Sequence, residues 1–85
     1  MTQNGITVYG TTWCGDCHRA RRVLNTIETP YAWIDVDADP AASEIVLQLN
    51  GGVRRVPTII FPDGSILVEP SNRALMDRLK LEPRD

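Results

Sequence analysis

The sequence has few of the residues that mark secreted, membrane-spanning or nucleic-acid-binding proteins. Only two of its 85 residues are cysteine, and only one is histidine. The 9 basic residues are outnumbered by 11 acidic ones, so the chain has no surplus of positive charge with which to neutralise phosphates. No apolar run approaches the roughly 20 residues that a membrane-spanning helix needs. We therefore expect neither nucleic acid nor a membrane among its partners.

The amino terminus also lacks the features of a secretory signal. Residues 1–10, MTQNGITVYG, have no basic start and no apolar stretch of about 7 to 15 residues. We therefore expect a cytoplasmic protein. In a reducing compartment, two cysteines that share one motif indicate catalysis or metal binding rather than a structural disulfide. The length and the 42% hydrophobic content predict a single domain over residues 1–85.

The pattern of apolar residues predicts alternating strands and helices. Short β-branched runs predict strands at residues 6–9, 31–36, 58–61 and 65–68, and helical spacing predicts helices after the cysteine pair, after Pro40 and after Ser71 or Asn72. Strands joined by a helix are expected to lie parallel, whereas Pro62-Asp63-Gly64 is typical of an antiparallel hairpin. The order β-α-β-α-β-β-α predicts an α/β protein of the thioredoxin fold, with a four-stranded mixed sheet flanked by helices.

Cys14-Gly15-Asp16-Cys17 is a CxxC motif at the predicted turn from the first strand into the first helix. Disulfide exchange needs a thiolate, and the free N–H groups and the dipole at a helix start stabilise an anion. Cys14 lies nearer the loop and is therefore the expected nucleophile. Cys17 follows on the same helical face and is the expected resolving thiol. The motif predicts a catalytic dithiol.

Other chemistries fit part of the same segment. With His18 the motif reads CxxCH, the spacing of covalent haem attachment, and Met76 offers a second axial ligand; a strand leading into the motif is not typical of the small helical cytochromes. Zinc needs four ligands, and Cys14, Cys17 and His18 supply three, so no metal site within one chain is predicted. An iron–sulfur cluster shared between two chains remains an alternative.

Three acidic residues after the second predicted strand resemble the start of a calcium loop. Asp35, Asp37 and Asp39 have the D-x-D-x-D spacing, but the sixth position from Asp35 is Pro40, where a calcium loop needs glycine. We interpret these residues as a strand end and as acidic residues at a helix start.

The neighbours of the cysteines have alternative interpretations. Trp13 is expected either to form an apolar docking surface beside the nucleophile or to pack in the core. Asp16 is expected either to disfavour a nearby thiolate or to be screened by water. His18 and the helix arginines, Arg19, Arg21 and Arg22, are interpreted as solvated, although one arginine could meet an anionic thiol substrate.

The sequence resembles the glutaredoxin family over residues 6–81. The resemblance rests on WCGDC after the first strand, on Val56-Pro57-Thr58 and on the turn Asp63-Gly64-Ser65. It implies a cis peptide bond before Pro57, beside the cysteine pair, where the Val56 main chain can pair with a substrate as an added strand. The expected catalytic residues are Cys14 and Cys17, and the expected substrate-binding residues are Trp13, Arg54, Val56, Pro57 and Ser71, with Arg55 as a second candidate.

Within the family, the chain is similar to the mycoredoxin branch at residues 50–58 and at Glu69-Pro70-Ser71. Mycoredoxins reduce mixed disulfides between proteins and mycothiol. The resemblance therefore implies a monomeric thiol–disulfide oxidoreductase that uses mycothiol, acts on disulfide-containing proteins and needs no tightly bound cofactor. Glutathione-dependent members usually carry Gly-Gly where this chain has Glu69-Pro70, which disfavours glutathione. The alternatives are a glutathione- or thioredoxin-reductase-coupled donor, for example to ribonucleotide reductase, and an iron–sulfur cluster carrier.

Overall fold

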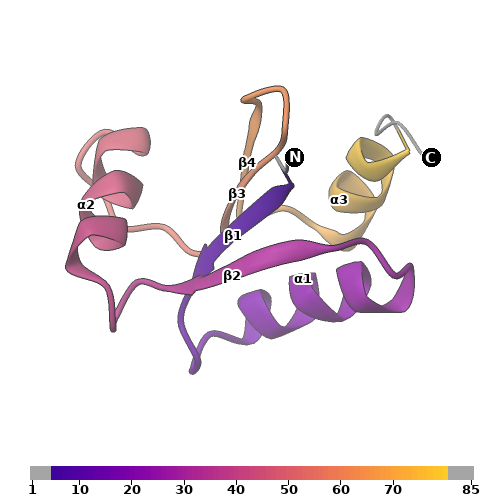
Figure 1. Ribbon diagram of the computed structural model, residues 1–85, viewed down its shortest axis with the longest axis horizontal. Helices are drawn as coiled ribbons and strands as arrows, with labels where there is room; N and C mark the ends of the chain where they lie inside the picture. The colour runs from indigo at the N-terminus through magenta and orange to yellow at the C-terminus, as the bar shows by residue number, and fades with distance from the viewer. Residues whose placement is uncertain (1–4, 81–85) are drawn as a thin grey trace.

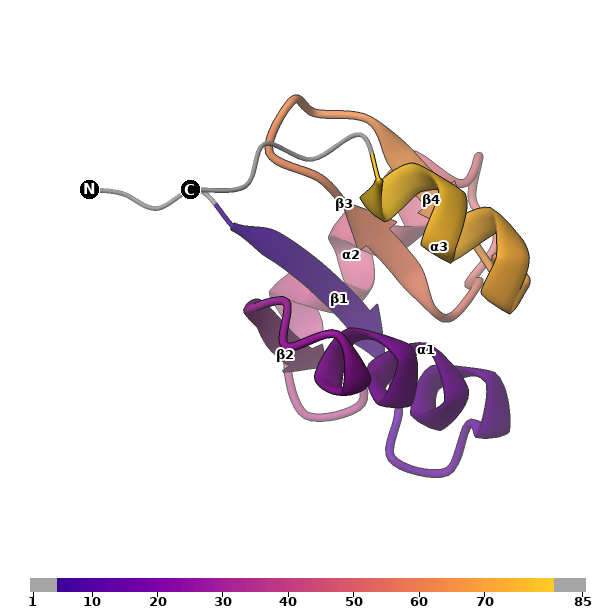
Figure 2. The ribbon, with the colours of Figure 1, turned by 90° about the vertical axis from the view of Figure 1, so that its right-hand side faces the viewer.

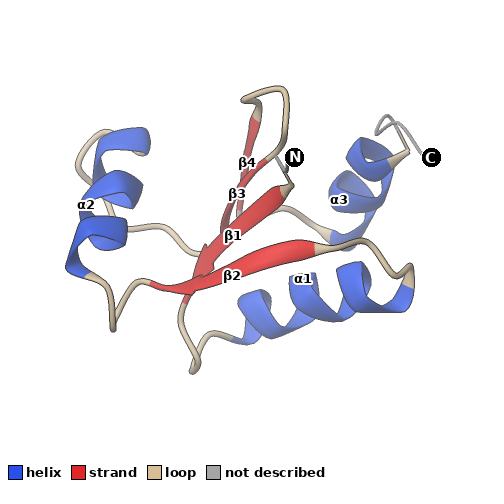
Figure 3. Ribbon diagram, in the orientation of Figure 1, coloured by secondary structure: helices blue, strands red, loops and turns tan. Residues whose placement is uncertain are grey.

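A computed structural model of the chain describes residues 5–80. Within this range the elements follow the predicted order β-α-β-α-β-β-α (Figure 1; Figure 3). The strands are β1 (Ile6–Gly10), β2 (Tyr31–Asp35), β3 (Thr58–Ile60) and β4 (Ile66–Val68), and the helices are α1 (Gly15–Thr26), α2 (Pro40–Leu49) and α3 (Asn72–Leu79). The ends of the domain predicted over residues 1–85, and the last residue of the resemblance over residues 6–81, lie outside the described residues.

The four strands form one mixed sheet in the order β2-β1-β3-β4. β1 runs parallel to β2, with Gly10 opposite Asp35, and antiparallel to β3, with Tyr9 opposite Thr58. β3 and β4 form the predicted antiparallel hairpin. Because of these directions, the chain leaves β1, leaves β2 and enters β3 at the same edge of the sheet. The loops that carry the cysteine motif, the acidic residues and Val56-Pro57 therefore meet there.

The helices cover both faces of the sheet. α1 and α3 lie on one face and α2 lies on the other (Figure 1; Figure 2). Since strand side chains alternate between faces, Val8 packs toward α1 and α3, whereas Tyr9 packs toward α2. The larger core cluster, between the sheet and the pair α1 and α3, contains Ile6, Val8, Ala20, Leu24, Ile59, Phe61, Leu75 and Leu79.

Local capping interactions close both ends of α2. Asp39 is the N-cap, because its carboxylate accepts a hydrogen bond from the Ala42 N–H at 3.1 Å, and Pro40 occupies the first turn. At the other end Gly51 has φ +68°, and the Gly52 N–H donates to the Leu47 carbonyl at 2.7 Å. This arrangement closes the helix with a glycine in the left-handed region, where other residues are strained.

Each of the four strands differs from its predicted range by one residue. β1 is one residue longer than predicted, and β2, β3 and β4 are each one residue shorter. Phe61 and Ser65, next to the hairpin strands, still pair through a hydrogen bond from the Phe61 N–H to the Ser65 carbonyl at 2.9 Å. α2 buries Ala42 and Val46, whereas Ile45 is 41% exposed and Leu49 is 40% exposed. A helix alone on its face of the sheet covers the strands with a narrow stripe only. Across residues 5–80 we find no helix long and apolar enough to cross a membrane.

Candidate active site

Cys14 is the N-cap residue of α1. Its Sγ accepts a hydrogen bond from the backbone N–H of Cys17 at 3.2 Å, in the position that a serine or aspartate oxygen takes in an ordinary cap. The side chain is partly exposed. A sulfur at this position faces the positive end of the helix dipole and an N–H group that has no partner inside the helix. The geometry therefore places the Cys14 sulfur at a helix start, within hydrogen-bonding distance of a backbone N–H and in a position that substrates can reach.

Cys17 lies in a different environment, one turn further into α1. Its side chain is fully buried, at 0% exposure, against the sheet. Burial raises the pKa of the Cys17 thiol to about 12, and a hydrogen bond with Cys14 acts in the same direction, whereas a backbone hydrogen bond from Thr11 opposes the shift. Cys17 therefore stays protonated at neutral pH. Both cysteines are free thiols in this structure.

Val56 and Pro57 border the cysteine pair, as the resemblance implies. The Val56–Pro57 peptide bond is cis, and Pro57 is buried. The Cys14 thiol donates a hydrogen bond to the Val56 carbonyl at 3.8 Å, a distance that sulfur permits. The main chain of Val56 is thus beside the Cys14 sulfur.

Gly10, at the end of β1, makes room for the buried thiol. A Cβ atom at this position would lie 2.7 Å from the Cys17 Sγ and 2.7 Å from Cη2 of Trp33. No side chain fits there without moving one of these groups. No role for Gly10 follows from the sequence alone, because contact with a residue seven positions away on a helix has no local signal.

Trp13 and Arg54 are joined by a residue that the sequence analysis did not assign to the site. The Trp13 side chain is 70% exposed, so the core interpretation is wrong and the docking interpretation remains. Its Nε1 donates to Oδ2 of Asp37 at 2.8 Å, and the Arg54 guanidinium forms an ion pair with Oδ1 of the same carboxylate. The hydrogen bond from Trp13, followed by that from Arg54, lowers the pKa of Asp37 below its ordinary value.

The neighbouring acidic residues have the structural roles predicted for them. Asp35 ends β2 and accepts from the Asp37 N–H at 2.9 Å, and Asp39 caps α2. Within residues 5–80 we find no group of three or more His, Cys, Asp or Glu side chains placed to hold a metal ion.

Asp16 and Arg19 connect the start of α1 to α3. Arg19 forms an ion pair with Asp16 at 2.9 Å and donates to the side-chain oxygen of Asn72 at 2.8 Å. Asp16 contributes the smallest of the effects that raise the pKa of Cys17. The interpretation of Arg19 as merely solvated is therefore wrong, and Asp16 is paired with this arginine rather than screened by water alone.

His18 and Arg21 also have specific partners. The His18 Nε2 lies 2.6 Å from the Thr12 carbonyl, and since a carbonyl only accepts, this nitrogen donates. The ring thus braces the loop that leads to Cys14. The Arg21 guanidinium stacks on Trp33 at 4.1 Å from the ring centroid, and it donates to the Tyr31 hydroxyl at 3.3 Å. His18 is exposed, as the solvated interpretation predicts, whereas Arg21 is partly buried and packs on Trp33, so that interpretation is wrong for Arg21. Helical spacing reveals neither residue's partner, because these partners lie in a loop and in β2.

The remaining predicted binding residues lie at the junction of β4 and α3 or face it. Ser71 is the N-cap of α3, and its Oγ accepts from the Ala74 N–H at 3.0 Å. Arg55 forms an ion pair with Glu69 at 3.6 Å. Glu69 has φ +49°, the left-handed region, and its N–H donates to the Pro57 carbonyl at 2.9 Å. Both Arg54 and Arg55 therefore have a carboxylate of the same chain as partner.

Comparisons with known proteins agree with this geometry. A family model described as glutaredoxin matches residues 6–66. A Mycobacterium tuberculosis protein described as a candidate glutaredoxin is 42% identical over 71 residues, which cover 84% of this chain and 84% of that protein. Mycoredoxin 1 of Corynebacterium glutamicum is 39% identical over 67 residues, which cover 79% of this chain and 82% of that protein.

Solved structures show the same fold. The structure of the glutaredoxin-like NrdH-redoxin from Escherichia coli, described as having a thioredoxin-like activity profile, matches with a TM-score of 0.73 and 25% identity over 94% of this chain and 97% of that chain. A glutaredoxin structure from Methanosarcina mazei Go1 matches with a TM-score of 0.74 and 21% identity over 89% of this chain and 78% of that chain. These matches confirm the predicted thioredoxin fold.

Proposed function

The chain belongs to the glutaredoxin family and is a thiol–disulfide oxidoreductase, and we propose that it reduces mixed disulfides between proteins and mycothiol. The observation that carries the proposal is the inequality of the two thiols, with Cys14 as a partly exposed helix cap beside Val56 and Cys17 fully buried. The similarity to Mycoredoxin 1 supports mycothiol as the small thiol. The proposal includes a cytoplasmic monomer that needs no tightly bound cofactor.

In the proposed reaction the Cys14 thiolate attacks the mycothiol sulfur of a protein–mycothiol mixed disulfide. A new disulfide forms between Cys14 and mycothiol, the old disulfide breaks, and the protein sulfur leaves as a thiolate and takes up a proton. A second mycothiol, as its thiolate, then attacks the mycothiol sulfur bound to Cys14. Oxidised mycothiol leaves, and the Cys14 thiolate is regenerated. Each cycle thus converts one mixed disulfide and one free mycothiol into one protein thiol and one molecule of oxidised mycothiol, so one disulfide is exchanged for another.

Cys17 offers a second route, in which its thiolate attacks the Cys14 sulfur and forms an intramolecular disulfide. That route requires a proton to leave a buried thiol whose pKa is about 12. The high pKa of Cys17 therefore supports release of mycothiol from Cys14 by a second small thiol, rather than by Cys17, at neutral pH.

Variants of the two cysteines test these roles. We expect Cys14→Ser to abolish reduction of a mycothiol mixed disulfide in an assay with mycothiol and its reductase, and Cys17→Ser to retain it. A second assay identifies the reducing system. Oxidised wild-type protein is incubated separately with mycothiol and its reductase, with glutathione and its reductase, and with thioredoxin reductase alone, and its reduction is compared. Activity that survives Cys14→Ser contradicts its assignment as nucleophile.

A thioredoxin-reductase-coupled donor is the second candidate, because a structure with a thioredoxin-like activity profile shares the fold over nearly the whole chain. In the three-way assay that candidate predicts reduction by thioredoxin reductase alone. Such a result would overturn the mycothiol assignment.

Alkylation provides an independent check on the inequality of the thiols. With a pKa of about 12, Cys17 is a thiolate in roughly one molecule in ten thousand at pH 8. We expect iodoacetamide at pH 8 to label Cys14 alone in the folded protein, as read by peptide mass spectrometry, and to label both residues in urea. Labelling of Cys17 at a rate equal to that of Cys14 in the folded protein would show that burial does not suppress its ionisation.

A further inference from the structure

Three arginines on the segments that border the cysteine pair each have a carboxylate of the same chain as partner. The pairs are Arg19 with Asp16, Arg54 with Asp37, and Arg55 with Glu69. We propose that Asp37 is a specificity-determining residue, which disfavours small thiols that carry free carboxylates and favours uncharged polar ones. The proposal rests on the small-thiol function proposed above and adds the chemical class of thiol that the site accepts.

Asp37 is placed to influence what approaches Cys14. It lies just after β2, at the edge of the sheet where the loops after β1 and before β3 also lie. One carboxylate oxygen accepts from the indole of Trp13, the residue before the nucleophile, and the other meets Arg54, two residues before Val56. Asp37 thus joins the two segments that carry Cys14 and Val56.

The charge state of Asp37 supports this role. The hydrogen bonds from Trp13 and Arg54 hold the pKa of Asp37 below its ordinary value, so the residue is an anion at neutral pH. The Trp13, Asp37 and Arg54 side chains are all exposed to solvent. A small thiol that approaches Cys14 from solvent can therefore contact them.

The pairing removes the gain that a carboxylate would obtain from Arg54. A free guanidinium beside the site would bind a carboxylate with paired hydrogen bonds. Here an incoming carboxylate must displace Asp37, which exchanges one ion pair for another, or remain close to an uncompensated anion. An uncharged thiol meets neither obstacle. Arg55 and Arg19 are not free to bind the carboxylate of a thiol either. Arg55 forms an ion pair with Glu69, and Arg19 forms one with Asp16.

A matched pair of probes tests the proposal. N-acetylcysteine and N-acetylcysteine amide differ in a single carboxylate, and each is presented as its mixed disulfide with 4-thiopyridine. When Cys14 attacks the cysteine sulfur, one disulfide forms, one breaks, and the released thiopyridone is followed by absorbance. Each rate constant is divided by that of 2-mercaptoethanol with the same probe, which corrects for intrinsic reactivity.

We expect the wild-type protein to prefer the amide probe. Asp37→Asn should raise the ratio of the corrected rate for the carboxylate probe to that for the amide probe by up to about fivefold, the upper range for one exposed ion pair. Asp77→Asn, which makes the same charge change on α3, should alter neither rate. High salt should reduce the wild-type preference, because the effect is electrostatic between exposed charges.

Further variants identify the charge that acts. Arg54→Gln should increase the preference for the amide probe, because Asp37 then lacks its counter-ion, and this variant remains informative if Asp37→Asn fails to fold. Trp13→Phe removes the indole N–H but keeps the ion pair, so the preference should persist. Equal wild-type rates for both probes, or equal shifts in Asp37→Asn and Asp77→Asn, would overturn the specificity role while leaving the oxidoreductase function intact. Absence of reaction with either probe would instead contradict the proposed small-thiol function itself.

Discussion

At the scale of single residues, the environment of the thiols depends on Thr11, which lies between β1 and the cysteine loop. Thr11 is fully buried, at 0% exposure. Its carbonyl accepts from the Cys14 N–H at 3.5 Å, and its backbone hydrogen bond favours the ionised form of Cys17. Its side-chain hydroxyl, however, has no hydrogen-bond partner within the described part of the chain. The backbone of Thr11 therefore hydrogen-bonds to both cysteines. Its Oγ1, in contrast, is a buried polar atom without a partner, which destabilises the fold.

Replacing this hydroxyl tests that conclusion. Thr11→Val has nearly the same shape and removes the unsatisfied oxygen, so we expect the free energy of unfolding in urea to rise by about 1 kcal/mol or more. Thr11→Ser keeps the oxygen and removes the methyl group, so we expect a loss of about 1 kcal/mol. A destabilised Thr11→Val protein would mean that the hydroxyl makes a useful interaction.

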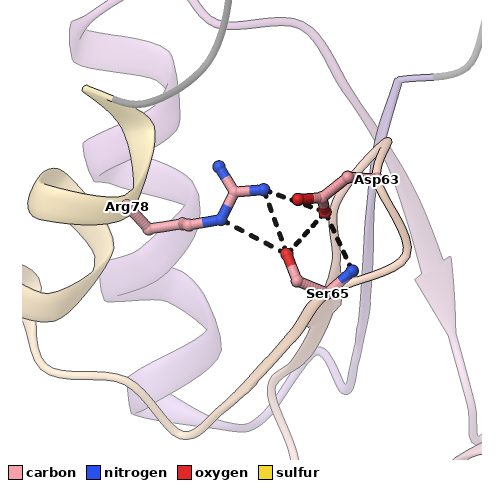
Figure 4. Close-up of polar contacts among 3 residues, drawn as sticks. All are labelled: Asp63, Ser65 and Arg78. Carbon is pink, nitrogen blue, oxygen red and sulfur yellow. Dashed lines mark hydrogen bonds and ion pairs between the residues drawn. The ribbon is translucent and has the colours of Figure 1, made fainter.

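At the scale of elements, a polar cluster fastens the turn between β3 and β4 to α3. Arg78 on α3 forms an ion pair with Asp63 at 3.1 Å and donates to the Ser65 hydroxyl at 3.0 Å (Figure 4). The same guanidinium stacks on Phe61, 4.1 Å from the ring centroid. Asp63 also accepts from the Ser65 N–H at 2.9 Å, as expected of an aspartate in a tight turn. The cluster thus joins a hairpin tip to the last described helix.

This cluster predicts a pH dependence of stability. Hydrogen bonds from Ser65, followed by the charge of Arg78, lower the pKa of Asp63 below its ordinary value. The unfolded chain therefore binds the proton first as the pH falls, and the contribution of Asp63 is present above about pH 5 and lost as the pH falls through the folded-state pKa. We expect Asp63→Asn to lower stability at pH 7 and to make the loss of stability between about pH 5 and pH 3 shallower.

Urea denaturation across that pH range measures the effect. Asp77→Asn removes a similarly exposed carboxylate outside the cluster and is the matched control. If Asp63→Asn and Asp77→Asn have the same pH profile, the cluster does not act through the charge of Asp63.

At the scale of the whole molecule, stability depends mainly on the larger core cluster between the sheet and the pair α1 and α3. α3 contributes Leu75 and Leu79 to that cluster, whereas the adjacent Met76 is 36% exposed. α2 packs on the opposite face through a smaller cluster. A chain of 85 residues has little stability to lose, so damage to the larger cluster is expected to affect the entire fold.

Two neighbouring substitutions compare the buried and exposed positions of α3. Leu75→Ala leaves a cavity at a residue that is 1% exposed, and we expect it to cost about 2 to 5 kcal/mol. Met76→Ala should cost clearly less. The midpoints of urea unfolding measure both, and equal costs would show that α3 is loosely docked.

Much of this architecture follows from local sequence. Apolar spacing, Asp39 with Pro40, and the Asp63-Gly64-Ser65 turn determined the order of elements, because these signals act over a few residues. The thioredoxin fold and the position of the CxxC motif followed from that order, and the glutaredoxin family followed from the motif together with Val56-Pro57-Thr58. Each predicted strand boundary was accurate to within one residue.

Only the tertiary structure decided the pKa of Cys17 and the hydrogen bonds and ion pairs around the cysteines. Spacing identified Cys17, but burial beneath Gly10 and against the sheet raised its pKa to about 12. Trp13 and Asp37 are 24 positions apart, and Asp37 and Arg54 are 17 apart, so no periodic pattern predicts that they meet. They meet because β1, β2 and β3 bring three loops to one edge of the sheet. Hydrogen bonds and ion pairs across that edge depend on strand register and direction, which the complete fold alone determines.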